Sequence, residues 1–334
     1  MALTPPVLAL PGTSPELGES LTDGLSRVND LIERRVDHDD PFIAEAAGHL
    51  VQAGGKRLRP LLTLLASELG PLGINDEVIS AAAAVELTHL ATLYHDDVMD
   101  EAHVRRGTPS ANARYGNSTA ILVGDLLFGT ASEITAALGS QAVLIQAQTF
   151  VRLCAGQIRD DRPAPDGEDP VAYYLSVLED KTGVLIATAA RYGGMFGGSS
   201  PEVVEMLREY GERLGMAFQL ADDLIDIASD ADETGKTPGT DLREGKATLP
   251  VLLVRSSTDP ADRPLQELLA SDLHDEDRLA AALVGLRGHR AMDEALERTR
   301  AIGREAVAVL DPLPPSDAKD ALIALVTSVV HRAG

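Results

Sequence analysis

Two aspartate-rich segments constrain this chain of 334 residues more than any other feature of its sequence. Residues 81–107 read AAAAVELTHLATLYHDDVMDEAHVRRG, and residues 211–230 read GERLGMAFQLADDLIDIASD. Each segment contains the spacing DDxxD on a run rich in Ala and Leu, which favours a helix. Residues four apart on a helix point the same way, so the first and last aspartates of each spacing share a face.

Carboxylates this close repel one another unless water or a cation screens them. One such cluster is usually a solvated helix end, but two copies on largely apolar helices favour a metal site. Magnesium fits best, because it prefers oxygen ligands and often joins a few carboxylates to substrate phosphates. The candidate metal ligands are Asp96, Asp97 and Asp100 in the first copy and Asp222, Asp223 and Asp226 in the second.

The first aspartate helix also carries candidate groups for binding an anion. His89 lies two turns before Asp96 on the same helical face, and Arg105 and Arg106 follow the helix directly. The segment therefore predicts a metal site with a basic rim above a small or apolar groove.

A second basic segment, GGKRLRP at residues 54–60, precedes the aspartate helix. Its two glycines free the backbone, and Lys56, Arg57 and Arg59 place three cations on a short turn at the start of a helix. Because a helix N-terminus already favours anions, this turn is a candidate seat for a diphosphate.

Composition excludes several classes of function. The net charge of −23 argues against a nucleic-acid partner, which needs a basic face. Hydrophobic residues make up 44% of the chain but aromatics only 3%, which suits close packing of helices. A single cysteine, Cys154, excludes an internal disulfide and suits a reducing compartment. No apolar run approaches the roughly 20 residues of a membrane span, and the N-terminus lacks a signal peptide, so we expect a cytoplasmic protein.

The chain reads as one all-α domain at residues 19–334 after a flexible extension at residues 1–18. Ser14 before Pro15 and Asp40 before Pro41 are helix-start signals. Gly183 is expected to interrupt a helix just after Lys181 and Thr182, and residues 229–248 are expected to form a long polar loop. No alternating pattern of useful length predicts a β-strand.

Several of these segments together resemble the trans-isoprenyl diphosphate synthases, over about residues 20–330. The segments are GGKRLRP, HLATLYHDDVMDEAHVRRG, VGDLLF, KTG, FQLADDLIDIASD and GKTPGTDLREGKATLP. The resemblance is strongest to the bacterial long-chain branch, which supplies quinone side chains. It implies a helical bundle around a deep central cavity, a homodimer, and two aspartate clusters that face each other across the mouth.

Residue roles follow from the resemblance at matching positions. Asp96, Asp100 and Asp222 resemble the direct ligands of the magnesium ions, of which the family holds about three when substrate is bound. The remaining aspartates complete the clusters. The seat of isopentenyl diphosphate corresponds to Lys56, Arg59, His89 and Arg106. The seat of the allylic diphosphate, farnesyl or geranylgeranyl, corresponds to Arg105, Lys181, Thr182 and Gln219, with loop lysines Lys236 and Lys246 closing over it.

The chemistry of the family makes these residues intelligible. Magnesium and cationic side chains stabilise the departing diphosphate while the allylic C–O bond ionises. The double bond of isopentenyl diphosphate then attacks the carbocation, and the released diphosphate takes the proton. We expect catalysis to depend on Asp96, Asp100, Asp222 and Lys181.

Product length is predicted from the residues upstream of Asp96, where short-chain members of the family carry a bulky aromatic. This chain has Ala91 and Thr92 there, and Thr88 and Ala84 further back. Small side chains leave room for a growing chain, so a product of about C30 to C45 is expected. The floor of the cavity is expected on the following helix, with Leu127, Phe128 and Ile134 as candidates.

Four alternatives stay open at this stage. A short-chain farnesyl or geranylgeranyl diphosphate synthase would share every motif. A class I terpene cyclase shares the first DDxxD but would replace the second with another metal motif. His95–Asp96 matches the dyad of an HD-type phosphohydrolase, which needs further histidine ligands. A non-catalytic partner subunit would not need both aspartate clusters.

Overall fold

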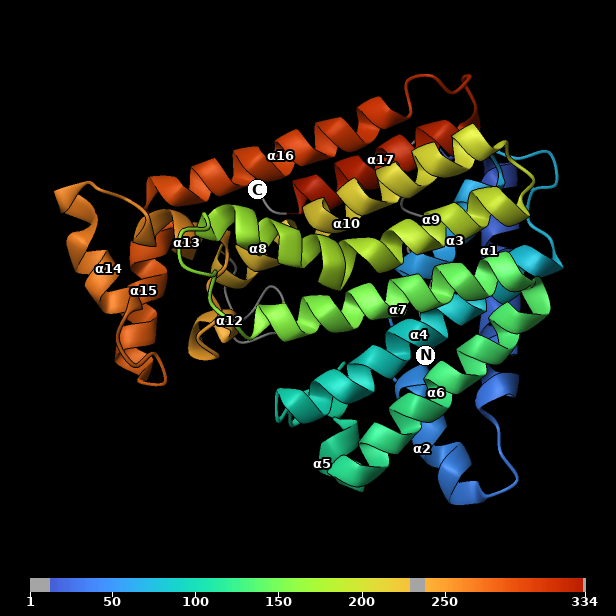
Figure 1. The fold of residues 1–334 in the computed structure, drawn as a ribbon, viewed down its shortest axis with the longest axis horizontal. Helices are drawn as coiled ribbons and strands as arrows, with labels where there is room; N and C mark the ends of the chain where they lie inside the picture. The colour runs from blue at the N-terminus through green and yellow to red at the C-terminus, as the bar shows by residue number, and fades with distance from the viewer. Residues whose placement is uncertain (1–12, 229–237, 333–334) are drawn as a thin grey trace. The chain divides into compact units, whose positions relative to one another are not determined.

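The structure is a computed structural model that describes residues 13–228 and 238–332 of the chain. Helices form nearly all of the described chain (Figure 1), as predicted for an all-α protein. The chain divides into two compact units that alternate along the sequence. Unit 1 comprises Met1–Val151, Leu185–Gly211 and Leu310–Ala324, and unit 2 comprises Arg152–Val184, Glu212–Val309 and Leu325–Gly334. The expectation of one domain at residues 19–334 stays a prediction.

The elements of unit 1 are α1 (Pro15–Val36), α2 (Pro41–Gln52), α3 (Leu58–Ser67), α4 (Asp76–Met99), β1 (Val104–Arg105), β2 (Thr108–Pro109), α5 (Ala111–Tyr115) and α6 (Asn117–Leu138). The elements of unit 2 are α8 (Pro170–Leu178), η2 (Glu179–Gly183), α12 (Thr240–Arg243), α13 (Leu249–Arg255), η3 (Pro260–Asp262), α14 (Arg263–Leu269), α15 (Glu276–Arg287) and α16 (Arg290–Val309). Helices with residues in both units are α7 (Ser140–Asp160), α9 (Val184–Phe196), α10 (Pro201–Ala228) and α17 (Asp317–His331).

The helix-start signals at Ser14 and Asp40 are confirmed. The Ser14 hydroxyl accepts a hydrogen bond from the Leu17 N–H at 3.3 Å, and Asp40 Oδ1 accepts one from the Phe42 N–H at 2.9 Å. Since α1 begins at Pro15 and buries Leu17, the flexible extension predicted for residues 1–18 is wrong for residues 15–18. Proline at the first helical position and the serine cap favour the helix from that point. Residues 1–12 lie outside the described residues.

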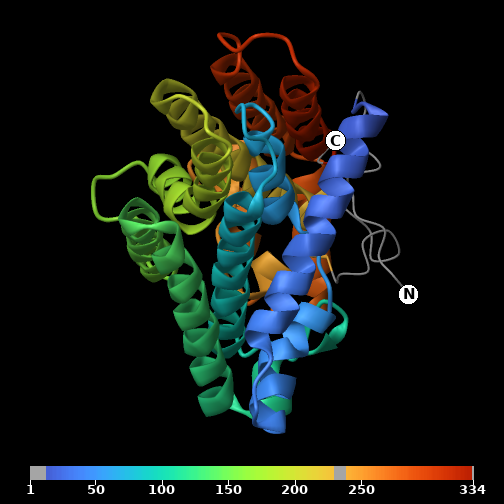
Figure 2. The same cartoon turned by 90° about the vertical axis from the view of Figure 1, so that its right-hand side faces the viewer.

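Helix α4, which carries the first aspartate cluster, is central to unit 1. It packs against α1, α3 and α6, and Figure 2 shows it (teal) running between α1 (blue) and α6 (green). Residues 81–84 are four consecutive alanines, all fully buried. Small side chains let neighbouring helices approach closely and bury the whole circumference of this stretch. This packing fixes the position of α4 and therefore of the aspartates at its C-terminal end.

A two-residue hairpin follows α4, where no strand was expected. Val104 pairs with Pro109, and Arg105 pairs with Thr108. The linking residues Arg106 and Gly107 have positive φ values of 54° and 76°, as a tight two-residue hairpin turn requires. Strands this short cannot produce a visible alternating pattern, so the sequence did not indicate them.

The expected helix interruption at Gly183 is wrong. Residues Glu179–Gly183 form a single π-helical turn that joins α8 to α9 without a break. A Cβ placed on Gly156 of α7 would lie 2.6 Å from the backbone nitrogen of Lys181. Gly156 therefore permits α7 to approach this π-turn closely. Such turns are frequent at functional sites.

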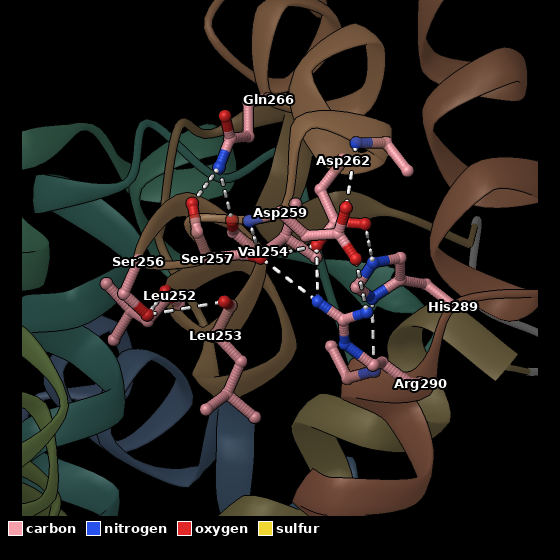
Figure 3. Close-up of polar contacts among 12 residues, drawn as sticks. Leu252, Leu253, Val254, Ser256, Ser257, Asp259, Asp262, Gln266, His289 and Arg290 are labelled. Carbon is pink, nitrogen blue, oxygen red and sulfur yellow. Dashed lines mark hydrogen bonds and ion pairs between the residues drawn. The ribbon is translucent and has the colours of Figure 1, made fainter.

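Unit 2 has an apolar core and a group of polar contacts around Asp262, and Figure 3 shows the polar contacts. Ile227, Val251, Leu269 and Leu286 belong to the buried cluster that joins α10, α13, α14 and α15. Above it, Asp262 accepts hydrogen bonds from the Ser257 hydroxyl at 2.5 Å and from Arg290 Nη2 at 2.7 Å. The buried carboxylate thus ties the turn after α13 to the start of α16.

Helix α6 is long and apolar enough to cross a membrane, contrary to the expectation that no segment of the chain is. Its 22 residues reach a mean hydropathy of 1.5 over an 18-residue window, of which 33% is buried. The prediction considered only unbroken apolar runs, whereas α6 mixes Ala, Leu, Ile and Gly with two acids. Core helices pass the same test of length and composition, and α6 packs along α4.

Candidate active site

The first aspartate cluster lies at the C-terminal end of α4, as the sequence predicted. Asp96 is half-buried on the last turn and Asp100 is the exposed C-cap, whose N–H donates to the Asp96 carbonyl at 2.8 Å. A helix C-terminus carries a partial negative charge, which adds to the charge of the two carboxylates. This end of α4 therefore favours a cation.

Asp97 has a different environment from its neighbours. Its side chain is fully buried; Oδ1 accepts a hydrogen bond from Arg105 Nε at 2.6 Å, and Oδ2 accepts one from the Ala111 N–H at 3.4 Å. These contacts tie the hairpin and the start of α5 to α4. Asp97 was predicted to bind metal and Arg105 to bind diphosphate. In this structure the two side chains are hydrogen-bonded to each other.

The basic group predicted in unit 1 is assembled around the turn before α3. Arg106 Nη1 donates to the carbonyls of Leu50, at 3.1 Å, and Gly54. A Cβ on Gly55 would lie 2.9 Å from the Arg106 guanidinium carbon, so only glycine leaves room for that side chain. Arg57 and Arg106 both adopt left-handed φ values, a strain that clusters at functional sites.

His89 on α4 feels the charge of this basic group. Desolvation, and then the charges of Arg59 and Arg106, hold the pKa of His89 well below its ordinary value, so the ring is neutral at pH 7. Burial also lowers the pKa of Arg59, and Glu86 opposes that shift. The Nε of Arg59 has no hydrogen-bond partner among the residues described. Lys56 is exposed on the same turn.

Arg57 was expected to contribute to the anion seat, but it pairs with Glu86. Its Nη1 lies 2.6 Å from Oε1 of Glu86, a side chain that is only 2% exposed, and its Nε donates to Asn29 Oδ1 at 3.0 Å. A lone glutamate in the apolar run of residues 81–91 was the sequence signal for this structural pair.

In unit 2, four side chains connect the predicted allylic seat to the second aspartate cluster. The Thr182 hydroxyl donates to Gln219 Oε1 at 3.2 Å, and Gln219 Nε2 donates to Asp223 Oδ1 at 2.9 Å. The hydroxyl of Tyr174 donates to the other oxygen of Asp223. Desolvation, and then the charge of Asp241, raises the pKa of Asp223 to about 7. Tyr174 is a site residue that the sequence analysis missed.

The other two aspartates of the second cluster are more accessible, and both already have partners. Asp222 Oδ1 lies 3.2 Å from Nη2 of Arg332, near the C-terminus. The positively charged guanidinium occupies the place next to the carboxylate where a metal ion could bind. The Asp226 carboxylate accepts hydrogen bonds from the Thr240 and Asp241 N–H groups at 3.3 and 3.2 Å. Asp226 therefore positions α12 after the loop.

Two of the three lysines predicted for the allylic seat form ion pairs with nearby carboxylates. Lys181 is on the π-turn, and its Nζ lies 2.7 Å from Oδ2 of Asp160 at the end of α7. Lys246 Nζ lies 2.8 Å from Glu244 Oε2. Lys236 lies outside the described residues. Beside Lys181, Arg152 bridges Glu179, Asp180 and Glu212 at 2.7 to 3.2 Å. The analysis of the sequence had missed this positioning arginine.

The donor set suits magnesium but does not form a closed cage. The described residues contain no group of three or more His, Cys, Asp or Glu side chains arranged to hold a metal ion. In unit 1, Asp96 is half-buried and Asp100 is exposed at the end of α4; in unit 2, Asp222 is half-buried. Magnesium commonly uses one or two carboxylates and completes its shell with water and substrate phosphates.

The chain is similar to known proteins in both sequence and structure. Residues 40–285 match the model of the protein family described as Polyprenyl synthetase. The chain is 45% identical to nonaprenyl diphosphate synthase of Mycobacterium tuberculosis over 93% of each chain. The structure superposes on geranylgeranyl pyrophosphate synthase from Corynebacterium glutamicum, complexed with calcium and isoprenyl diphosphate, with a TM-score of 0.86, 43% identity, and coverage of 96% of this chain and 98% of that one.

A decaprenyl diphosphate synthase from Rhodobacter capsulatus also superposes with a TM-score of 0.86, at 34% identity and over 96% of this chain and 99% of the other. The family match covers both aspartate clusters and both basic segments. The chain therefore belongs to the polyprenyl synthetase family of prenyltransferases.

Proposed function

We propose that the protein is a trans-polyprenyl diphosphate synthase, which condenses isopentenyl diphosphate head-to-tail with a farnesyl or geranylgeranyl diphosphate primer. The observation that carries this proposal is the grouping of basic side chains before α3 and after α4, where Arg106 donates to the carbonyls of Leu50 and Gly54 and its guanidinium lies against Gly55. His89 lies two turns before Asp96, so α4 carries one member of the proposed anion seat as well as the proposed metal ligand Asp96. One substrate can be held while the other loses its diphosphate.

Asp96, Asp100 and Asp222 are proposed as magnesium ligands, with Asp97, Asp223 and Asp226 in supporting positions. Bound magnesium, about three ions in the family, would neutralise the departing diphosphate. The supporting aspartates have structural contacts: Asp97 holds Arg105, and Asp223 receives hydrogen bonds from Gln219 and Tyr174. We propose that the reaction requires both clusters.

The two substrate seats are proposed to use different side chains. Lys56, Arg59, His89 and Arg106 would bind isopentenyl diphosphate. After desolvation, the charge of Arg106 also lowers the pKa of Arg59, and this repulsion supports the assignment, since a bound anion would relieve it. Arg105, Lys181, Thr182, Gln219, Lys236 and Lys246 would bind the allylic diphosphate. The contact of Thr182 with Gln219 supports a shared role for those two residues.

A product of about C30 to C45 is proposed, for use as a quinone side-chain precursor. The relative named for a nonaprenyl (C45) product supports this length, and the one named for a decaprenyl (C50) product supports a long chain in general, while the geranylgeranyl relative represents the short-chain alternative. On α4, small side chains occupy the positions of the buried Ala91 and Ala84 upstream of Asp96, although Leu87, Leu90 and Tyr94 lie on the same helix.

We further propose that the protein is a cytoplasmic homodimer that pairs through α6 and α7. These helices carry exposed apolar side chains within unit 1: Ile121, Leu122, Leu126, Val143, Leu144 and Val151, between 39% and 68% exposed. Clustered exposed apolar side chains are typical of interfaces. Leu122→Glu should shift the wild-type dimer toward monomer in sedimentation equilibrium, and a wild-type monomer would contradict the proposal.

The proposed reaction is tested by incubating the protein with isopentenyl diphosphate, farnesyl diphosphate and magnesium. Chain-extended prenyl diphosphates are expected, and chelation of magnesium should abolish them. A cyclic hydrocarbon would instead indicate a terpene cyclase, and phosphate release without a longer chain would indicate a phosphohydrolase. Asp96→Ala serves as the matched inactive control.

A further inference from the structure

A buried histidine on α2 contacts the hairpin that carries two arginines of unit 1. His49 Nε2 lies 2.8 Å from the backbone oxygen of Pro109 on β2, and His49 is 8% exposed. A carbonyl oxygen only accepts hydrogen bonds, so Nε2 must carry the proton and donate it. His49 therefore ties the last turn of α2 to the second strand of the hairpin.

The same turn of α2 also binds the side chain of Arg106, which lies in the turn of the hairpin. Arg106 Nη1 donates a hydrogen bond to the carbonyl of Leu50, next to His49, at 3.1 Å, and a second one to the carbonyl of Gly54. This part of the chain thus contacts β2 through a side chain and Arg106 through backbone carbonyls. A shift of the hairpin relative to α2 would separate Arg106 from these acceptors.

The backbone of Arg106 has a conformation that requires support from its surroundings. Its φ of 54° lies in the left-handed region, which a non-glycine residue adopts at an energetic cost and keeps only where other contacts fix it. The hairpin supplies little of this support, because its strands pair through only two residues each, and a hairpin alone is marginally stable in water. The hydrogen bond from His49 is a contact from outside the hairpin.

Arg105, on the first strand, is held by a different contact. Its Nε lies 2.6 Å from Oδ1 of Asp97, a fully buried carboxylate on α4. His49 instead contacts the second strand, on the other side of the turn. The two neighbouring arginines therefore depend on different helices, α4 for Arg105 and α2 for Arg106.

We propose that His49 is a positioning residue that holds Arg106 in the seat of isopentenyl diphosphate. The inference rests on the proposed function, in which Arg106 binds that substrate and Arg105 binds the allylic diphosphate. His49 is buried and bonded to the hairpin, so it acts through Arg106 and does not touch the substrate. Loss of its hydrogen-bond donor should weaken binding of isopentenyl diphosphate and leave binding of the allylic primer nearly unchanged.

Two substitutions separate the hydrogen-bond donor of His49 from its ring. His49→Phe keeps an aromatic ring for the edge-on contact with Tyr115, in which the ring centroids are 5.4 Å apart, but it has no donor. It should raise the KM for isopentenyl diphosphate by about tenfold and the KM for the primer by less than about twofold. His49→Gln restores an N–H group near the position of Nε2, so both KM values should stay close to those of the wild type.

Two further variants control for stability. Thr149 on α7 and Thr188 on α9 have their hydroxyl oxygens 2.6 Å apart, and both residues are buried. Thr149→Val loses this buried hydrogen bond but should keep the wild-type KM values. His49→Asn has an amide one carbon shorter than glutamine, which does not reach Pro109, so it should behave as His49→Phe does and provides the test if His49→Phe fails to fold.

Steady-state kinetics with isopentenyl diphosphate, farnesyl diphosphate and magnesium give the two KM values. Hydrogen–deuterium exchange of residues 103–110, where the Ser110 N–H donates to the His103 carbonyl at 3.0 Å, reports on the hairpin independently of activity. Faster exchange and a selective rise in the KM for isopentenyl diphosphate in His49→Phe, both reversed in His49→Gln, support the proposal.

Unchanged KM values in His49→Phe, or an equal rise in both, would overturn the proposal. If His49→Phe fails to fold, His49→Asn with the same KM values as His49→Gln would overturn it. A wild-type protein that makes no prenyl diphosphate would contradict the proposed function instead, and the exchange measurement would still test whether His49 holds the hairpin.

Discussion

Arg105 Nε lies 2.6 Å from Oδ1 of Asp97, and the carboxylate in this pair is fully buried. The three aspartates of the first cluster therefore do different work. Adjacent residues on a helix point about 100° apart, so Asp97 faces the protein while Asp96 and Asp100 face outward. The motif combines a proposed metal site with a structural anchor for the hairpin that carries Arg105 and Arg106.

Removing one proposed metal ligand from either cluster should remove most activity. Asp96→Ala and Asp222→Ala should each lower kcat by roughly a thousandfold, because several kcal/mol of charge stabilisation is lost in the transition state. Circular dichroism should show an unchanged helix content. Either variant with near-normal turnover at limiting magnesium would refute a shared role for the two clusters.

Asp97→Ala should act on stability more than its neighbours do. The change leaves the Arg105 guanidinium without its buried partner, which typically costs about 3 kcal/mol or more. Asp100→Ala, at an exposed position, should change the free energy of unfolding by less than about 1 kcal/mol. Urea unfolding measures both, and equal effects of the two substitutions would contradict the structural role of Asp97.

The two proposed diphosphate seats should be separable by steady-state kinetics. Arg59→Ala should raise the KM for isopentenyl diphosphate more than the KM for the allylic primer, since Arg59 belongs to the basic group around His89. Lys181→Ala should show the opposite bias. If each variant affected both substrates equally, the assignment of the seats would be wrong.

His89 should make stability depend on pH. Its pKa in the folded protein is well below the ordinary value, so in mildly acidic solution the unfolded chain takes up a proton that the folded chain does not. Asp223, whose pKa is raised to about 7, takes up a proton first in the folded protein and so acts in the opposite direction over the same range. The contribution of His89 itself should lower the free energy of unfolding by up to about 1.4 kcal/mol per pH unit below about pH 6.5 and add no pH dependence above it.

This dependence should disappear in His89→Gln and persist in His103→Gln, whose side chain is exposed. Urea titrations at pH 5.5 and 7.5 provide the comparison. A wild-type protein whose slope is unaffected by His89→Gln would mean that another group is responsible.

Ala91→Tyr should shorten the product sharply while turnover continues. Residue 91 is buried on α4 between Asp96 and Thr88, at 1% exposure, and a tyrosine there fills space without touching the metal ligands. Chromatography of the products gives the chain length. A wild-type product of C15 or C20, or an unchanged length in the tyrosine variant, would contradict the proposal that small residues on α4 permit a long product.

Local signals in the sequence determined the helices and the identities of the site residues. Ser14 and Asp40 cap helices through hydrogen bonds to residues two or three positions away, and the DDxxD spacing places Asp96 and Asp100 on one face of a helix by periodicity alone. These interactions are decided within one or two helical turns. These interactions can therefore be predicted from neighbouring residues in the sequence.

The tertiary structure decided which polar groups meet. Asp97 finds Arg105 across a hairpin too short to predict, Asp222 meets Arg332 from the C-terminal helix, and Thr88 pairs with a glutamine 58 residues away. The π-turn that presents Lys181 likewise formed where glycine suggested a break. Such pairings depend on which faces the packed helices bring together, and a hydrogen bond between distant residues leaves no periodic signal in the chain.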